Sequence, residues 1–292
     1  MPSIGPPTPI PAPPGANYFP DRLSYASPDG KWTLVYHTPR EWHMDATGWQ
    51  ARLLRGRRDV TREHQEFLRV AGDRGFRGER NFQPWSRDNA SLAFVTWDDE
   101  PVFVYEIANK KAVHLPYRRP YISAAQFAPD MDRLLIASAA DGLLVDHAGN
   151  ERQVVRWGIA RDTATHTFWM TSGRCFVLLT LARERASAVL SFFRGDDGSL
   201  LESRDFNPSD LVPYDVEQYA GLPRNGLSLT LVNPPGVQAV GLLLDTWSDV
   251  RFDQASNTLS LSVLRPVSPP VKENGALRCR VDFRWVAVRL GD

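Results

Sequence analysis

The sequence predicts an all-β protein built from small four-stranded sheets that repeat along the chain. In each repeat, an aromatic residue is followed seven positions later by the first apolar residue of a β-like run, with turn residues between the two. A second pair of apolar runs, joined by a polar turn, follows each of these motifs. A fixed period of strand, tight turn and strand is typical of a ring or stack of β-sheets. The aromatic anchors are Tyr25, Trp85, Phe127, Trp169 and Phe252.

The first unit is longer than the units that follow it. Its anchor lies 60 residues before the next one, whereas the anchors at positions 85, 127 and 169 are 42 residues apart. The surplus falls between Trp42 and Arg80, where residues 61–70 read as a short helix with Thr61 as N-cap and Gly72 as the stop. We therefore expect an insertion around residues 42–80 in the first unit.

A basic turn precedes this predicted helix. It contains Arg55, Arg57 and Arg58, with Asp59 and Glu63 close behind them in sequence. Opposite charges at such spacing favour a solvated, salt-bridged loop.

The second, third and fourth units share one plan, in which Gly, Asn and Asp residues supply the turns between outer strands. The predicted outer strand pairs are residues 102–105 with 113–115, 143–145 with 154–155, and 189–193 with 200–201.

The number of units depends on the segment between the last two anchors. These anchors are 83 residues apart, close to twice the period, which implies a hidden unit. Residues 227–231 alternate apolar and polar side chains after a turn at 223–226 and supply its strand. The sequence therefore predicts six units of four strands, with five or seven as the fallback because this hidden unit is irregular.

The N-terminal segment differs from the rest of the chain. Residues 1–20 contain eight prolines, which excludes a helix or a central strand and favours an extended arm. The spacings Pro6 to Pro9 and Pro11 to Pro14 match the PxxP form that aromatic grooves bind, and a plain tail is the alternative. We expect an arm at residues 1–20 and a single β domain at residues 21–292.

Two turn motifs carry a resemblance to a known family. Ser27-Pro28-Asp29-Gly30-Lys31-Trp32 and Phe127-Ala128-Pro129-Asp130 resemble the SPDG-type repeat of WD40-like, TolB-type β-propellers. The resemblance implies that each repeat is one four-stranded blade and that the PDG turn joins its two inner strands. No family-wide catalytic residue comes with this repeat, so the resemblance implies a fold and little else.

Composition limits the classes of partner. Lys plus Arg and Asp plus Glu both number 34, so no long-range field favours nucleic acid or an anionic membrane. No run approaches the roughly 20 apolar residues that a membrane span requires. Cys175 and Cys279 alternate with apolar residues and are expected to be free, buried thiols. With neither the basic start nor the apolar stretch of a secretory signal at the N-terminus, these features predict a cytoplasmic protein without membrane insertion.

The search for catalytic motifs is negative. The sequence contains no GxSxG, HExxH or CxxC motif and no glycine-rich phosphate loop. Its six histidines are scattered without a recognised ligand spacing. We therefore predict no metal, no cofactor and no catalytic residue.

The family topology indicates a candidate binding face. In such propellers, the loops that join the second and third strands and the loops between blades lie on one face. Aromatic and charged side chains around a central depression would form a recognition surface there. The residues expected on this face are Trp42, His43, Trp97, Asp98, Asp99, Glu100, His166, Trp247 and Asp249.

The leading functional hypothesis is a non-enzymatic propeller that serves as a protein-interaction scaffold or assembly factor. It is expected to be monomeric on its own and to bind an unidentified protein partner. The alternatives are a propeller enzyme, either a hydrolase or a lyase, and a binder of a small molecule or glycan. Both would use carboxylates and a histidine at the channel mouth.

Overall fold

The computed structural model describes most of the chain in segments. They are residues 2–6, 8–11, 13, 22–37, 50–72, 76–77, 83–96, 102–115, 117, 122–129, 133–138, 141–146, 151–157, 163–182, 187–206, 227–231, 250–266, 271–273 and 276–291.

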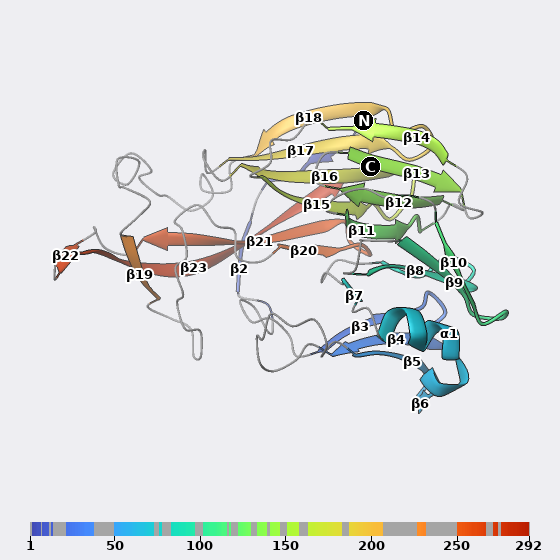
Figure 1. The fold of residues 1–292 in the computed structure, drawn as a ribbon. Helices are drawn as coiled ribbons and strands as arrows, with labels where there is room; N and C mark the ends of the chain where they lie inside the picture. Colours follow the sequence, from blue (N-terminus) through green and yellow to red (C-terminus); the bar gives the residue numbers. More distant parts are fainter. Residues whose placement is uncertain are drawn as a thin grey trace.

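The described strands form five sheets that follow one another around the molecule (Figure 1), and we call them blades 1 to 5. The first four sheets have four strands each, and the fifth is a four-stranded blade with three further strands paired to β23 (Ala276–Gly291). In blades 1 to 4 the chain passes through the four antiparallel strands in sequence order. Blade 1 consists of β3 (Arg22–Ala26), β4 (Trp32–His37), β5 (Gln50–Arg55) and β6 (Arg58–Asp59), and blade 2 of β7 (Phe76–Arg77), β8 (Ser91–Thr96), β9 (Val102–Glu106) and β10 (Lys111–His114). Blade 3 consists of β11 (Ile122–Phe127), β12 (Arg133–Ser138), β13 (Asp141–Asp146) and β14 (Glu151–Arg156), and blade 4 of β15 (Thr163–Trp169), β16 (Cys175–Ala182), β17 (Ser187–Arg194) and β18 (Leu200–Phe206).

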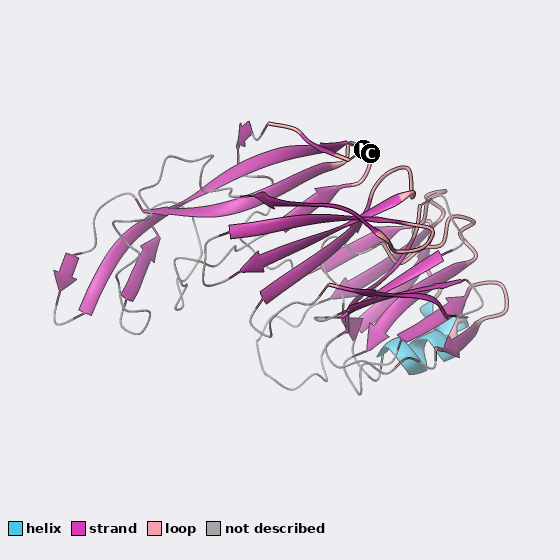
Figure 2. Cartoon of the chain, turned by 90° about the horizontal axis from the view of Figure 1, so that it is seen from above, coloured by secondary structure: helices cyan, strands magenta, loops and turns pink. Residues whose placement is uncertain are grey.

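Blade 5 is assembled from both ends of the chain. Its strand order is β20 (Val250–Asp253), β21 (Thr258–Pro266), β23 (Ala276–Gly291) and β1 (Ser3–Ile4). β1 is antiparallel to β23, with Ser3 opposite Gly291, so the two chain ends lie side by side (Figures 1 and 2). The N-terminal strand thus completes the last blade and covers the outer edge of β23.

The N-terminal arm is therefore part of the sheet along part of its length. Beyond β1, the strand β2 (Thr8–Ile10) also pairs with β23, from Thr8 opposite Ala287 to Ile10 opposite Trp285. Pro9 is tolerated here because an outermost strand needs no amide donor on its open side. Residues 3–4 and 8–10 are therefore strands of the sheet and neither a plain tail nor a free PxxP ligand. Part of the second PxxP segment, Pro11 to Pro14, lies outside the described residues.

The described residues form five blades, so the leading prediction of six units is wrong and the number given as a fallback is the one observed. The segment taken for a hidden unit is β19 (Leu227–Leu231), which runs parallel to β23 and pairs with residues 277–281. β23 is 16 residues long, so its first half extends beyond blade 5 and also pairs with β22 (Val271–Glu273), as Figure 1 shows. The long interval before the last anchor holds an extension of blade 5 and no blade of its own among the described strands.

The seven-residue offset seen in the sequence is the register of each blade's inner hairpin. Residues seven apart face each other across the first two strands, on either side of a four-residue turn. The pairs are Trp85 with Leu92, Phe127 with Leu134, Trp169 with Phe176, and Phe252 with Leu259. In blade 1 the equivalent pair is Ala26 with Thr33, and Tyr25 faces Leu34, so the anchor predicted there is displaced by one residue.

Apolar side chains fill the spaces between successive blades. Separate buried clusters join blades 1 and 2, blades 2 and 3, blades 3 and 4, and blades 4 and 5. Two anchors add a hydrogen bond across such a space: Trp85 Nε1 donates to the carbonyl of Tyr25 at 2.8 Å, and Trp169 Nε1 donates to the carbonyl of Gln126 at 3.2 Å. The two tryptophan anchors thus connect neighbouring blades through their indole N–H groups as well as through their rings.

The helix predicted after blade 1 is present as three short pieces. They are η2 (Thr61–Glu63), α1 (Gln65–Phe67) and the π-helical turn η3 (Leu68–Gly72). The predicted N-cap role of Thr61 is wrong, because its hydroxyl accepts a hydrogen bond from the Leu53 amide of β5 at 2.9 Å. The insertion lies between blades 1 and 2, since the buried Phe67 ring lies 5.4 Å from that of Tyr105 on blade 2.

Candidate binding site

A pocket opens between blades 1 and 2 at the face that carries the inner hairpin turns. Its volume is about 430 Å³. It is lined by Trp32 and Arg55 of blade 1, by Asn89 and Lys110 of blade 2, and by His64 at the start of the insertion, among others. Every one of these residues lies in a turn, beside a turn or in the insertion, so the site depends on how the turns are held.

The SPDG turn holds the blade 1 side of the pocket. Asp29 accepts hydrogen bonds from the Ser27 hydroxyl at 2.7 Å and from the Lys31 amide at 3.0 Å. These bonds lower the pKa of Asp29 to about 2. The Ser27 oxygen in turn accepts from the Trp32 amide at 3.0 Å. A charged Asp29 thereby fixes the point at which Trp32 enters β4.

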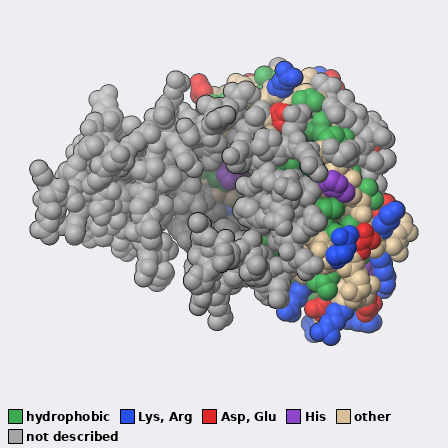
Figure 3. Space-filling model, in the orientation of Figure 1, with side chains coloured by type: hydrophobic (Ala, Val, Ile, Leu, Met, Phe, Trp, Pro, Cys, Tyr) green, Lys and Arg blue, Asp and Glu red, His purple; other side chains and the backbone are tan. Residues whose placement is uncertain are grey.

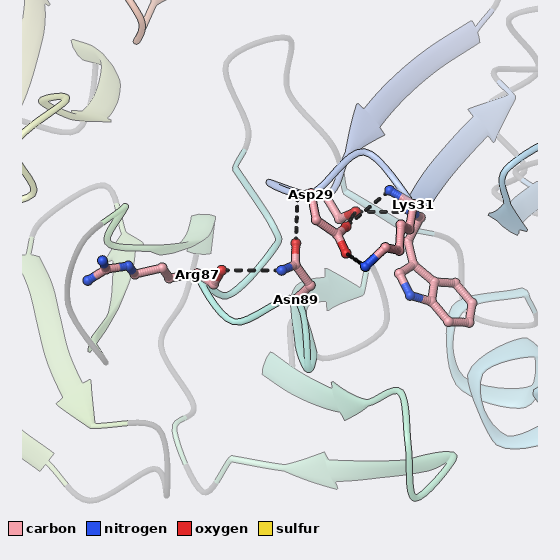
Figure 4. Close-up of polar contacts among 6 residues, drawn as sticks. Asp29, Lys31, Arg87 and Asn89 are labelled. Carbon is pink, nitrogen blue, oxygen red and sulfur yellow. Dashed lines mark hydrogen bonds and ion pairs between the residues drawn. The ribbon is translucent and has the colours of Figure 1, made fainter.

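The corresponding turn of blade 2 uses Asn89 in the left-handed region, with φ of 62°. Its side-chain oxygen accepts a hydrogen bond from the Asp29 amide at 2.9 Å, and Figure 4 shows this bond joining the two turns. The same kind of hydrogen bond joins the turns of blades 4 and 5. The Thr171 amide donates to Asn257 Oδ1 at 2.8 Å, and Asn257 has φ of 51°. Asparagine suits this position because it tolerates the left-handed region and carries an acceptor.

The insertion forms one wall of the pocket, and hydrogen bonds within the insertion and the preceding turn hold this wall in place. Asp59 accepts from the amide of Thr61 at 2.9 Å and from its hydroxyl at 2.6 Å, which lowers the pKa of Asp59. Arg58 and Glu63 form an ion pair across the same short segment. The salt-bridged loop predicted for this turn is thus present for Arg58.

His64 and Tyr105 form the buried back of the pocket. His64 Nδ1 lies 2.7 Å from the Tyr105 hydroxyl, and its ring is perpendicular to the Trp32 ring at 5.8 Å. Burial, followed by the positive charge of Lys110, lowers the pKa of His64, although Glu63 opposes the shift. Burial likewise raises the pKa of Tyr105. At neutral pH both groups are therefore uncharged, and Tyr105 holds the His64 ring that packs against Trp32.

The rim of the pocket is basic. The Arg55 guanidinium lies over the Trp32 ring, 5.6 Å from its centre. Lys110 stands on the opposite side, in the turn between β9 and β10. Figure 3 shows blue and red side chains gathered over the region where Figure 1 places β6 and α1. An aromatic face flanked by cations above an apolar floor is suited to binding a partly apolar, partly anionic group.

The residues predicted from sequence for the binding face are not tested by this structure. Eight of them lie outside the described residues: Trp42, His43, Trp97, Asp98, Asp99, Glu100, Trp247 and Asp249. The ninth, His166, is half-buried on β15, the first strand of blade 4, and its ring stacks on Phe168 with centres 6.4 Å apart.

The pocket uses the opposite ends of the same strands. Trp32 begins β4, whereas Trp42 follows its far end, and Asn89 precedes β8, whereas Trp97 follows that strand. Arg55, Arg58 and Glu63 stand out in the sequence, but as a solvated, salt-bridged loop. Trp32, Asn89 and Lys110 were missed, because each reads alone as a turn or strand residue. The feature that distinguishes Lys110, its positive φ of 51°, is seen only in the structure.

Comparison with known proteins identifies the fold. No protein-family model matches the chain, and no curated protein matches it either. Among solved structures, the Dos1 propeller matches 92% of this chain and 54% of its own, with a TM-score of 0.50 and 7% identity. The fold is a β-propeller.

Other solved structures of the WD40-like and TolB types are also similar to this propeller. The β-propeller domain of Cps50 (Swd1) from Myceliophteria thermophila matches over 82% of this chain and 61% of its own, with 10% identity and a TM-score of 0.43. A putative TolB from Agrobacterium tumefaciens matches over 64% and 65%, with 14% identity and a TM-score of 0.41. The propeller thus spans less than two thirds of each of these chains. Within its described residues, no helix has the length and apolar character needed to cross a membrane.

Proposed function

We propose that this protein is a non-enzymatic propeller that binds a segment of a protein partner in the pocket between blades 1 and 2. The observation that carries the proposal is the Arg55–Trp32 stack at the rim of this pocket. Tryptophan and arginine are the residues most enriched among those that dominate the energy of protein interfaces. Here the ring is half-buried and the guanidinium is exposed, so a partner can contact both.

The insertion supports the same role. Blade 1 has a two-residue outer strand, and the helical pieces that follow occupy the place where its sibling blades have longer outer strands. Extra length in a regular repeat is usually found at a binding face, where variation affects the core little. In this chain the added segment contributes Glu63 and His64 to the pocket.

The rest of the proposal follows the sequence analysis. The protein is a cytoplasmic scaffold that needs no cofactor and is monomeric without its partner. The face around Trp42, Trp97 and Trp247 remains our prediction for a second contact surface.

The test is capture of partners from the native host with tagged protein, followed by mass spectrometry. We expect Arg55→Glu to reduce recovery of the specific partner by about tenfold or more, because it removes the cation and introduces repulsion at the rim. The matched control is Arg194→Glu, since Arg194 precedes the glycine of the same turn in blade 4 and faces Cys175 as Arg55 faces Trp32. Equal recovery with both variants, each folded, would show that the pocket is not the interface.

A further inference from the structure

We propose that the ligand of this pocket is an acidic peptide segment, with a carboxylate held between Arg55 and Lys110 and a neighbouring apolar side chain against Trp32. This inference rests on the proposed function and specifies its ligand.

The charge of the lining points to an anion. Three cations line the pocket, Arg55, Arg58 and Lys110, against one acidic residue, Glu63. Glu63 is paired with Arg58. Among the described residues, neither Arg55 nor Lys110 has a carboxylate partner within ion-pair distance, so their charges are available to a ligand. The stack on Trp32 orients the planar guanidinium, which favours two-point binding of a carboxylate.

The apolar part of the lining favours a peptide over a phosphate polymer. Val60 and Ile107 are buried in the floor, and the Trp32 ring is partly exposed above them. A phosphate backbone would leave this apolar surface unused, and the chain has no net charge to draw a polyanion. A segment that alternates acidic and apolar side chains matches both parts of the pocket.

Lys110 supplies an independent observation, because it has φ of 51°. The residue at the same place in the β17–β18 turn of blade 4 is Gly198, with φ of 66°. Glycine adopts this conformation without strain and lysine does not. The turn therefore gains nothing from a lysine here. What the side chain adds is a positive charge at the rim of the pocket, close enough to affect the pKa of His64.

The position of Lys110 allows a variant that separates binding from folding. Lys110→Gly removes the charge and relieves the backbone, so we expect an unfolding temperature equal to or above that of the wild type. Fluorescence anisotropy would measure binding of a labelled ten-residue peptide that alternates Glu and Val. We expect Lys110→Gly and Arg55→Gln each to weaken its binding about tenfold, and Arg194→Gln to leave it unchanged.

Two further probes complete the test. A Gln–Val peptide of the same length should bind at least tenfold more weakly than the Glu–Val peptide, and a labelled single-stranded oligonucleotide should also bind more weakly. Any one of four results would overturn the inference. These are no binding of the Glu–Val peptide, equally tight binding of the Gln–Val peptide, tighter binding of the oligonucleotide, or a Lys110→Gly variant that binds the Glu–Val peptide as well as the wild type does. A comparison of two folded variants separates this inference from the proposed function. If Trp32→Ala abolished partner capture from the host and Lys110→Gly did not, the proposed function would stand and only the acidic nature of the ligand would be wrong.

Discussion

Replacing Trp169 by alanine is expected to lower the free energy of unfolding by about 3 to 5 kcal/mol, the range typical of deleting a large buried aromatic ring. Trp169 is 1% exposed and packs edge-on against Phe176, with ring centres 5.3 Å apart. Its N–H also donates to the Gln126 carbonyl of blade 3. Alanine would leave a cavity between blades 3 and 4 and would remove the hydrogen bond that joins them at the Gln126 carbonyl. Urea unfolding followed by circular dichroism measures the loss.

Two control variants divide this effect into its parts. Trp169→Phe keeps most of the ring contacts and removes the N–H donor, so we expect a smaller loss of about 1 to 2 kcal/mol. Phe127 and Phe252 occupy the same position in blades 3 and 5, so a phenylalanine fits this hairpin. Leu201→Ala, at a side chain that is 40% exposed, should change stability by less than about 0.5 kcal/mol. A loss below 1 kcal/mol for Trp169→Ala would contradict the packing described for blades 3 and 4.

Removal of residues 1–10 is expected to destabilise the protein by on the order of 2 to 4 kcal/mol and to make it self-associate. The deletion removes β1 and β2, and with them Ile4, which packs against the core shared by blades 4 and 5. It also uncovers the outer edge of β23, and an uncovered strand edge pairs readily with another chain. Thermal unfolding and size-exclusion chromatography report the two effects.

Addition of a synthetic peptide with the sequence of residues 2–11 should reverse the change, because it can pair with β23 as the native strand does. A truncated protein that is monomeric and as stable as the full chain would show that the N-terminal strands do not close blade 5.

The repeat could be predicted from sequence because its signal is local. The seven-residue offset depends on a hairpin with a four-residue turn, which lies within a single stretch of chain. It therefore identified the inner hairpins of blades 3 to 5. In blade 2 the anchor Trp85 forms an isolated bridge outside the first strand, and in blade 1 the anchor is displaced by one residue. The prediction of an all-β propeller with four-stranded blades is confirmed.

The number of blades and the fate of the N-terminus depend on pairings between distant segments. Leu227–Leu231 has the alternation of a strand, but its partner is β23, about 50 residues later. The same strand also takes the proline-rich N-terminus on its edge. Alternation predicts that a segment is extended and does not predict its partner, so these parts could not be assigned from sequence.

The pocket was inaccessible to sequence reasoning for a similar reason. Arg55 and Lys110 are in turns of different blades, and their proximity follows from the packing of those blades. The link between the turns, from the Asp29 amide to Asn89, joins residues 60 positions apart. Only the conformation of Lys110 distinguishes it from an ordinary turn lysine.

Hydrogen–deuterium exchange on the complex with the captured partner tests the central proposal most directly. We expect the partner to slow exchange in the segments 53–66 and 105–112, which carry Arg55, His64 and Lys110, and to leave residues 200–206 of β18 unchanged. Protection confined to the segments around residues 97–101 and 245–249, with no change around the pocket, would contradict the proposal and assign binding to the surface predicted from sequence.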